Sequence, residues 1–208
     1  MRVYKFIEKD VLEQIRANGT VKLSSAEKIR ADERGKVGEG DGGYADDLEL
    51  ATKWAPGPRS ELLTPDHPFI TKSNLRLEKP VMLHIAAGAE FVFGGSAHLF
   101  CASTSRSAEV VRGMRDRFGY NASYAINDIN ALGRAVCRAL GKTEFHSDAV
   151  TYQDFETSSL TTFDKTAFHK PSRFAWQQEY RLIFEGQGDD QIVKVPGFWR
   201  FISSIRHH

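Results

Sequence analysis

The sequence has few cysteines, no long apolar run and almost no excess charge of either sign. Its 208 residues contain only Cys101 and Cys137, which form no CxxC pair and cannot hold a metal by themselves. We expect two buried thiols in a reducing compartment. The longest apolar stretch, residues 81–95, is interrupted by His84 and Glu90 and is too short to cross a bilayer.

The charge balance and the first residues restrict the class of protein further. Lys and Arg number 28 against 27 Asp and Glu, a formal net charge of +1, so bulk attraction to nucleic acid is not implied. The opening MRVYKFIEKD turns acidic within ten residues and lacks the pattern of a secretory leader, so we expect a cytoplasmic protein without a membrane partner. The length predicts one domain over residues 1–206, and His207 and His208 are interpreted as a possible tag remnant.

The hydrophobic pattern predicts an α+β fold around a split or sandwiched antiparallel sheet with peripheral helices. Residues 25–47 are polar and glycine-rich and are predicted to be a long loop, of which 35–43 would form a mobile cover. Strands are predicted at 2–6, 20–25, 69–74, 75–80, 81–87, 89–95, 97–104, 122–128, 148–154, 173–186 and 191–205. Helices are predicted at 8–19, 45–55, 107–119 and 129–141.

Common site motifs are missing, and three separated features remain. The sequence has no phosphate-binding GxxxxGK[ST] loop, no HExxH and no GxSxG, and we expect no metal. The first remaining feature is a cation on the opening strand, Arg2 or Lys5, beside Tyr4. The second is the triplet 103–105, Ser-Thr-Ser, after an apolar strand, and the third is the segment 177–179, Gln-Gln-Glu.

In this combination and order the chain resembles the ADP-ribosyltransferase superfamily of the arginine, serine, glutamate type. The triplet 103–105 matches its STS segment, and Gln177-x-Glu179 matches its Q-x-E pair. RVYKF, FCAST and FAWQQEYRLIF also resemble uncharacterised bacterial proteins, often near phage-defence genes, that end in a W-x-x-E-x-E-Y-R-L-like strand. The resemblance extends over most of the chain.

The resemblance implies NAD as co-substrate and a role for each matched residue. Glu179 would stabilise the ribose cation formed when nicotinamide leaves, because a carboxylate placed there binds the transition state better than the ground state. Ser103 would hold Glu179 or the ribose. Gln177 would face the same pocket, but it cannot act as a base because its side chain is a neutral amide. Dinucleotide contacts would come from Arg2, Tyr4, Lys5, Thr104 and Ser105. Arg2 and Lys5 point to opposite sides of a strand, so only one of them would face NAD.

The resemblance further implies a mono-ADP-ribosyltransferase, an NAD-dependent glycosyltransferase acting as a bacterial toxin or antiviral defence effector. Its acceptor would be a nucleic acid (RNA or DNA) or a protein, and a neutralising antitoxin or immunity protein would accompany it. Two alternative functions stay open: a catalytically inert module that binds a nucleotide or a protein, and an NAD glycohydrolase.

Ordinary structural roles would also explain the same residues. Ser105 or Ser107 can cap the helix that follows, and Glu179, beside Arg181 in a strand, can form a cross-strand or same-face ion pair without a catalytic role. Arg106, Arg112, Arg115 and Arg117 can be a solvated helix face or a patch that holds a phosphate backbone.

Overall fold

The structure is a computed structural model that describes residues 1–29, 51–72, 75–89, 91–94, 96–154 and 168–208. It is an α+β protein built on an eight-stranded sheet whose strand pairs are antiparallel. The sheet strands are β1 (Val3–Ile7), β2 (Thr20–Ser25), β7 (Ala97–Ser103), β8 (Ala122–Ile126), β9 (His146–Ala149), β12 (Glu179–Glu185), β13 (Gln191–Lys194) and β14 (Ile202–His207). The predicted α+β class is therefore confirmed.

The sheet divides at β7. Along one edge β7 pairs with β12 over its full length, from Glu179 opposite Ser103 to Glu185 opposite Ala97. Along the other edge it pairs with β2 at residues 98–99 and with β1 only at Ser103. Between these two contacts, the described part of the chain gives β7 no strand partner on that edge. The sheet therefore opens beside Cys101, between β1 and β2.

The main hydrophobic core lies on one face of this sheet. Helices α1 (Lys9–Asn18) and α5 (Ile129–Ala139) pack there with the 3-10 helix η2 (Phe198–Phe201). α1 ends where predicted, at Gly19, whose φ of 63° is left-handed and whose N–H donates to Ile15 O. α5 begins at Asp128, whose carboxylate accepts from the Ala131 N–H. Strand residues facing this core include Phe100 and Leu182.

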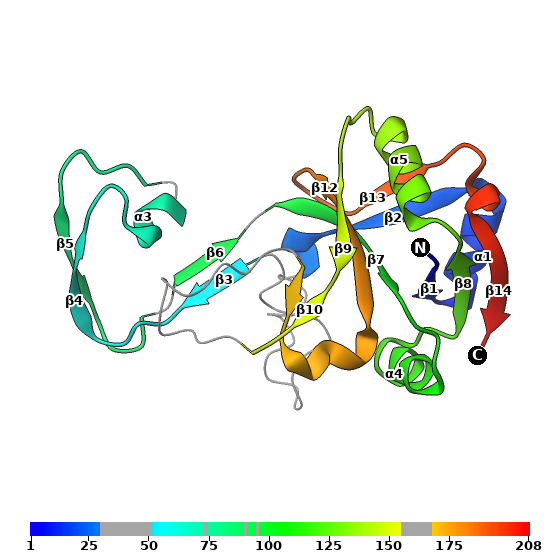
Figure 1. Ribbon diagram of the computed structural model, residues 1–208, viewed down its shortest axis with the longest axis horizontal. Coiled ribbons are helices and arrows are strands. Elements are labelled where there is room, and N and C mark those ends of the chain that lie inside the picture. Colours follow the sequence, from blue (N-terminus) through cyan, green and yellow to red (C-terminus); the bar gives the residue numbers. More distant parts are fainter. Residues whose placement is uncertain (30–50, 73–74, 90, 95, 155–167) are drawn as a thin grey trace.

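α4 (Ala108–Phe118) and the 3-10 helix η1 (Ser172–Gln177) lie outside this core and contact each other. α4 and α5 lie at opposite ends of the strands in Figure 1. α4 rests on η1 through Gly113, where an added Cβ would come within 2.4 Å of the Trp176 ring. A larger residue at this position would push apart the two helices that flank the end of β12.

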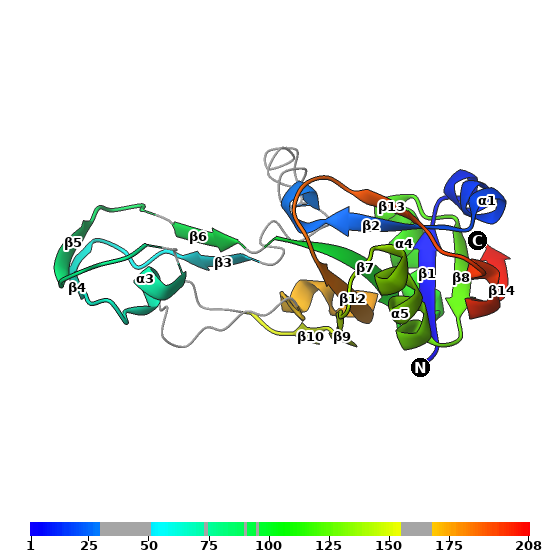
Figure 2. The same ribbon diagram turned by 90° about the horizontal axis from the view of Figure 1, so that it is seen from above.

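A separate arm extends from the sheet in both views (Figures 1 and 2). It consists of β3 (Ala51–Trp54) paired with β6 (Phe91–Gly94), β4 (Arg59–Leu63) paired with β5 (Val81–Ile85), and α3 (Pro68–Lys72). Its own small core contains Leu63, Phe69, Ile70 and Ile85.

Three predictions for this arm are wrong. Residues 51–54, predicted as the end of a helix, form β3, because pairing with β6 overrides the local preference. Residues 69–72, predicted as a strand, lie in α3, where Pro68 suits the first turn and Thr71 N–H donates to His67 O. Residues 75–80, also predicted as a strand, form none.

The remaining small features can be placed briefly. β10 (Thr151–Tyr152) and β11 (His169–Lys170) form a two-stranded parallel ladder beside β9 and β12. His207 ends β14, and His208 Nε2 lies 2.8 Å from Ser123 Oγ. None of the helices that the structure describes is long and apolar enough to span a membrane. The proposed cover, residues 35–43, lies outside the described residues.

Candidate active site

A cavity of about 210 Å³ opens at the split in the sheet. It collects side chains from the beginning, the middle and the end of the sequence. The lining residues are Tyr4, Lys5, Phe6, Ser24, Ile29, Cys101, Ala102, Ser103, Met114, Phe118, Tyr120, Lys170, Gln177 and Glu179. Five residues predicted for the site are among them: Tyr4, Lys5, Ser103, Gln177 and Glu179.

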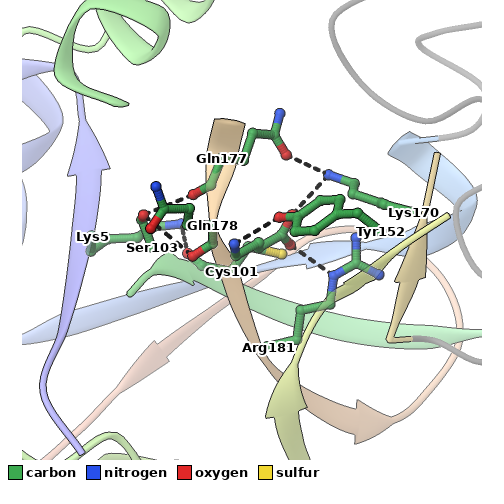
Figure 3. Close-up of polar contacts among 9 residues, drawn as sticks. Lys5, Cys101, Ser103, Tyr152, Lys170, Gln177, Gln178 and Arg181 are labelled. Carbon is green, nitrogen blue, oxygen red and sulfur yellow. Dashed lines mark hydrogen bonds and ion pairs between the residues drawn. The ribbon is translucent and has the colours of Figure 1, made fainter. Parts of the chain in front are cut away.

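Glu179 lines this cavity as the first residue of β12, and its carboxylate binds two cations, Lys170 and Arg181, which are labelled in Figure 3. Oε2 accepts from Lys170 Nζ at 2.8 Å, and Oε1 accepts from Arg181 Nε at 2.7 Å. The backbone N–H of Glu179 donates to the Tyr152 hydroxyl at 2.7 Å. Both the position and the orientation of this carboxylate are therefore fixed by charged and polar partners.

All three members of this ion cluster are buried. Arg181 is 0% exposed, Lys170 6% and Glu179 7%. Burial by itself would raise the pKa of Glu179, but the adjacent Arg181 and Lys170 charges, with a Cys101 hydrogen bond, hold that pKa well below its ordinary value. Glu179 therefore stays ionised at neutral pH.

The segment before Glu179 differs from the prediction. Residues 173–186 were expected to form one strand with Gln177 and Glu179 on one face, but η1 ends at Gln177 and β12 begins at Glu179. Gln178 between them has φ 46° and ψ 54°, the left-handed conformation that non-glycine residues rarely adopt. The same-face prediction is wrong. Gln177 still reaches the cavity, where its Oε1 accepts from Lys170 Nζ at 2.9 Å.

The Ser-Thr-Ser triplet holds this turn. Ser103 Oγ donates to the Gln177 carbonyl at 2.7 Å, and Thr104 N–H donates to the Gln178 carbonyl at 2.7 Å. The Thr104 hydroxyl donates to the same carbonyl at 3.1 Å. Ser103 therefore fixes the backbone that presents Glu179, and no bond from Ser103 to the Glu179 carboxylate is found among the described residues.

The last serine of the triplet leads into α4 and does not line the cavity. Ser105 N–H donates to Ser103 Oγ, and Ser105 Oγ accepts from Ser107 N–H. Ser107 is the N-cap, because its Oγ accepts from Val110 N–H at 3.3 Å. The capping interpretation of this segment is therefore correct for Ser107, while Ser103 and Thr104 serve the turn before Glu179.

Of the two candidate cations on the first strand, Lys5 faces the cavity. Lys5 Nζ donates to the Cys101 carbonyl at 2.8 Å across the split and lies 4.9 Å from the Phe100 ring centroid. Burial lowers the pKa of Lys5. Arg2 does not line the cavity; its guanidinium lies 5.7 Å from the Tyr4 ring centroid.

Lys170, Tyr152 and Cys101 were not predicted as site residues. Lys170 sits on the two-residue strand β11, which reaches Glu179 only through tertiary structure, so no local pattern marks it. Arg181 was predicted as a structural ion-pair partner of Glu179, and that ion pair is present at 2.7 Å. The same contact serves both interpretations of Glu179, catalytic and structural.

Among the described residues, the charged side chains that line the cavity are those of Lys5, Lys170 and Glu179. A lysine ammonium can bind a phosphate group through charge-assisted hydrogen bonds. Among the described residues, no group of three or more His, Cys, Asp and Glu side chains lies close enough together to hold a metal.

The ion cluster also predicts how stability depends on pH. An unfolded chain protonates Glu179 near the ordinary pKa of 4.5, whereas the folded chain keeps the carboxylate charged to lower pH. The stabilisation is therefore complete above the ordinary pKa and is lost as the pH falls through the lowered folded value. Thermal unfolding between about pH 3 and about pH 7 should show a Tm that falls on acidification, and the fall should be shallower in Glu179→Gln. Equal slopes in both proteins would contradict the assignment.

Comparisons with protein-family models, with curated proteins and with solved structures find no match. Function must therefore be argued from the cavity itself. Three predicted elements of the site meet there: the late carboxylate, the serine in the middle of the chain and the early cation.

Proposed function

We propose that the protein is an NAD-cleaving mono-ADP-ribosyltransferase with an ADP-ribosyltransferase-like split sheet. The observation that carries the proposal is that Glu179, Ser103 and Lys5 line one cavity although they are distant in sequence. Tyr4, Ser103 and Glu179 also lie in one row across β1, β7 and β12. A chance set of surface residues would not converge in this way at the point where the sheet opens.

In this reaction the glycosidic bond between ribose and nicotinamide breaks, and its electron pair leaves with nicotinamide. The ribose becomes cation-like, and the Glu179 carboxylate stabilises that charge. An acceptor nucleophile then bonds to the ribose carbon and releases its proton. The turn at residues 177–178, held by Ser103 and Thr104, keeps the carboxylate in place during this step.

Lys170 would be the residue that responds to the dinucleotide. Its ammonium occupies one oxygen of Glu179 and thereby weakens the pull of the carboxylate on a sugar cation. A lysine has a flexible stem and a point charge, so a pyrophosphate nearby can draw it off Glu179. Arg181, which is completely buried, would stay and keep Glu179 ionised. The pyrophosphate of NAD would thus remove Lys170 from Glu179 and leave one oxygen of this carboxylate free to face the ribose.

The size of the cavity indicates how NAD would enter. Pockets that enclose most of a drug-sized ligand measure about 300–1,000 Å³. The cavity of about 210 Å³ is smaller, so it would enclose one end of the dinucleotide while the rest lies outside. We propose that the nicotinamide ribose is the enclosed end, because Glu179 lies inside.

The biological role proposed is that of a bacterial cytoplasmic toxin or antiviral defence effector. Its acceptor would be a nucleic acid or a protein. A neutralising antitoxin or immunity protein would be needed by the cell that makes it, because unchecked transfer of ADP-ribose consumes NAD and modifies essential targets.

Incubating the purified protein with NAD and measuring released nicotinamide tests the proposal. We expect release by the wild type and by Glu185→Gln, a control at the exposed end of the same strand. Labelled NAD with added RNA, DNA or cell lysate then separates transfer, in which label stays on a macromolecule, from hydrolysis. Absence of nicotinamide release under every condition would overturn the proposal.

A second candidate, an inert module that binds a nucleotide, is favoured by one observation. Both oxygens of the Glu179 carboxylate already accept from cations, which is how a structural ion pair would look. Such a module would bind ADP-ribose without consuming NAD. Calorimetric binding of ADP-ribose, run beside the nicotinamide assay, distinguishes the two candidates.

A further inference from the structure

A group of arginines lies beside the cavity on the same face of the sheet. Arg106 and Arg2 approach the ring of Tyr4, with guanidinium carbons 4.8 Å and 5.7 Å from its centroid. Arg206 extends from β14, where it pairs with Ser123, which in turn pairs with Phe6 of β1. Phe6 and Tyr4 are two residues apart and point to one side. We call Arg2, Arg106 and Arg206 the Tyr4 arginine cluster.

Among the residues that the structure describes, no carboxylate forms an ion pair with the Tyr4 arginine cluster. Within the described ranges, no salt bridge joins any of its three members to an acid, and Arg106 Nη1 is buried without a hydrogen-bond partner. Arg106 has a lowered pKa because of burial and of the nearby charges of Arg206 and Arg2. The three charges repel one another, so an anion that enters between them would relieve that repulsion.

The cluster borders the cavity through one shared residue. Tyr4 lines the cavity, and the Arg106 guanidinium lies over the Tyr4 ring. An anion bound by the cluster would therefore be separated from the cavity only by the Tyr4 side chain. Arg115 of α4, one of the basic residues noted in the sequence, pairs with Asp116 and is therefore already neutralised. Arg2 and Arg106, which lie over the Tyr4 ring, have no such acidic partner among the described residues.

We propose that the Tyr4 arginine cluster binds the phosphate backbone of a single-stranded nucleic acid and so presents a nucleotide to the cavity as the ADP-ribose acceptor. This proposal rests on the proposed function. Guanidinium groups bind phosphates through paired hydrogen bonds, and a backbone offers one phosphate after another to successive arginines.

Fluorescence anisotropy with a labelled oligonucleotide tests this inference without any NAD. We expect the wild type to bind single-stranded oligothymidylate or oligouridylate, and to bind it more weakly at about 200 mM salt than at about 50 mM salt. Arg206→Gln should reduce the slope of log affinity against log salt by about one, and Arg2→Gln with Arg206→Gln by about two. Both arginines are exposed, so the fold should be unaffected.

The matched control is Arg16→Gln, which removes one charge from an exposed arginine that pairs with Glu13 on α1. The inference is overturned if Arg206→Gln binds the oligonucleotide like Arg16→Gln, or if polyglutamate binds the wild type as tightly as the oligonucleotide does. A cluster-dependent affinity combined with no NAD cleavage would overturn the proposed function and leave the nucleic-acid surface standing.

Discussion

Replacing Glu179 by glutamine is expected to slow NAD cleavage by about a hundredfold to a thousandfold, the loss that follows removal of one preorganised electrostatic contact. The neutral amide can no longer balance a ribose cation. It also removes the carboxylate that the buried Lys170 and Arg181 both bind, which should cost about 3–5 kcal/mol of stability. The rate is measured as nicotinamide release, and folding is checked by circular dichroism.

A double variant separates lost catalysis from lost folding. In Glu179→Gln combined with Lys170→Met, one cation disappears with the carboxylate, so the cluster keeps its formal charge of +1. We expect the double variant to recover much of the thermal stability of the wild type and none of its activity. NAD turnover within a few-fold of the wild type, in either variant, would remove Glu179 from the mechanism.

Replacing Arg181 by methionine is expected to cost about 3–5 kcal/mol of stability, because it breaks a buried ion pair. For a chain of this length each kcal/mol lowers Tm by about 2–4 °C, so the midpoint should fall by roughly 6–20 °C. The pKa of Glu179 should rise, since the charge of Arg181 is the strongest attraction that lowers it. Thermal unfolding followed by circular dichroism measures the effect.

Arg16→Met is the matched control, because Arg16 also pairs with a glutamate but both side chains are about half exposed. Exposed ion pairs contribute about 0–1 kcal/mol, so its Tm should stay close to that of the wild type. Equal changes in Tm for Arg181→Met and Arg16→Met would show that burial of the cluster around Glu179 does not govern stability.

Secondary structure in the sheet could be predicted where local pattern and tertiary context agree. A left-handed cap at Gly19 ends the first helix, and an apolar run forms the strand that ends in Ser103. A side-chain cap at Asp128 begins the helix that follows it. The predictions for residues 51–54 and 69–72 were wrong, because strand pairing within the arm and the helical turn at Pro68 determine their conformation. Local preference is too weak to resist such contacts.

The convergence of the site could be predicted only in outline. Ser103, Glu179 and Lys5 meet in one cavity, but their contacts differ from those expected. Gln178 interrupts the expected strand with a left-handed backbone conformation, which the glutamine side chain does not predict. Ser103 therefore donates to the backbone of this turn, at the Gln177 carbonyl. Lys170 lies nine residues from Glu179 and is brought next to it by the β10–β11 ladder. Such contacts depend on how distant segments pack.

The most direct test of the account is a crystal structure of the folded double variant, Glu179→Gln with Lys170→Met, in complex with NAD. The account predicts that the nicotinamide ribose lies over residue 179, inside the cavity at the split of the sheet, with Lys5 and Tyr4 on the dinucleotide. NAD bound on another surface, or no bound NAD at saturating concentration, would contradict it.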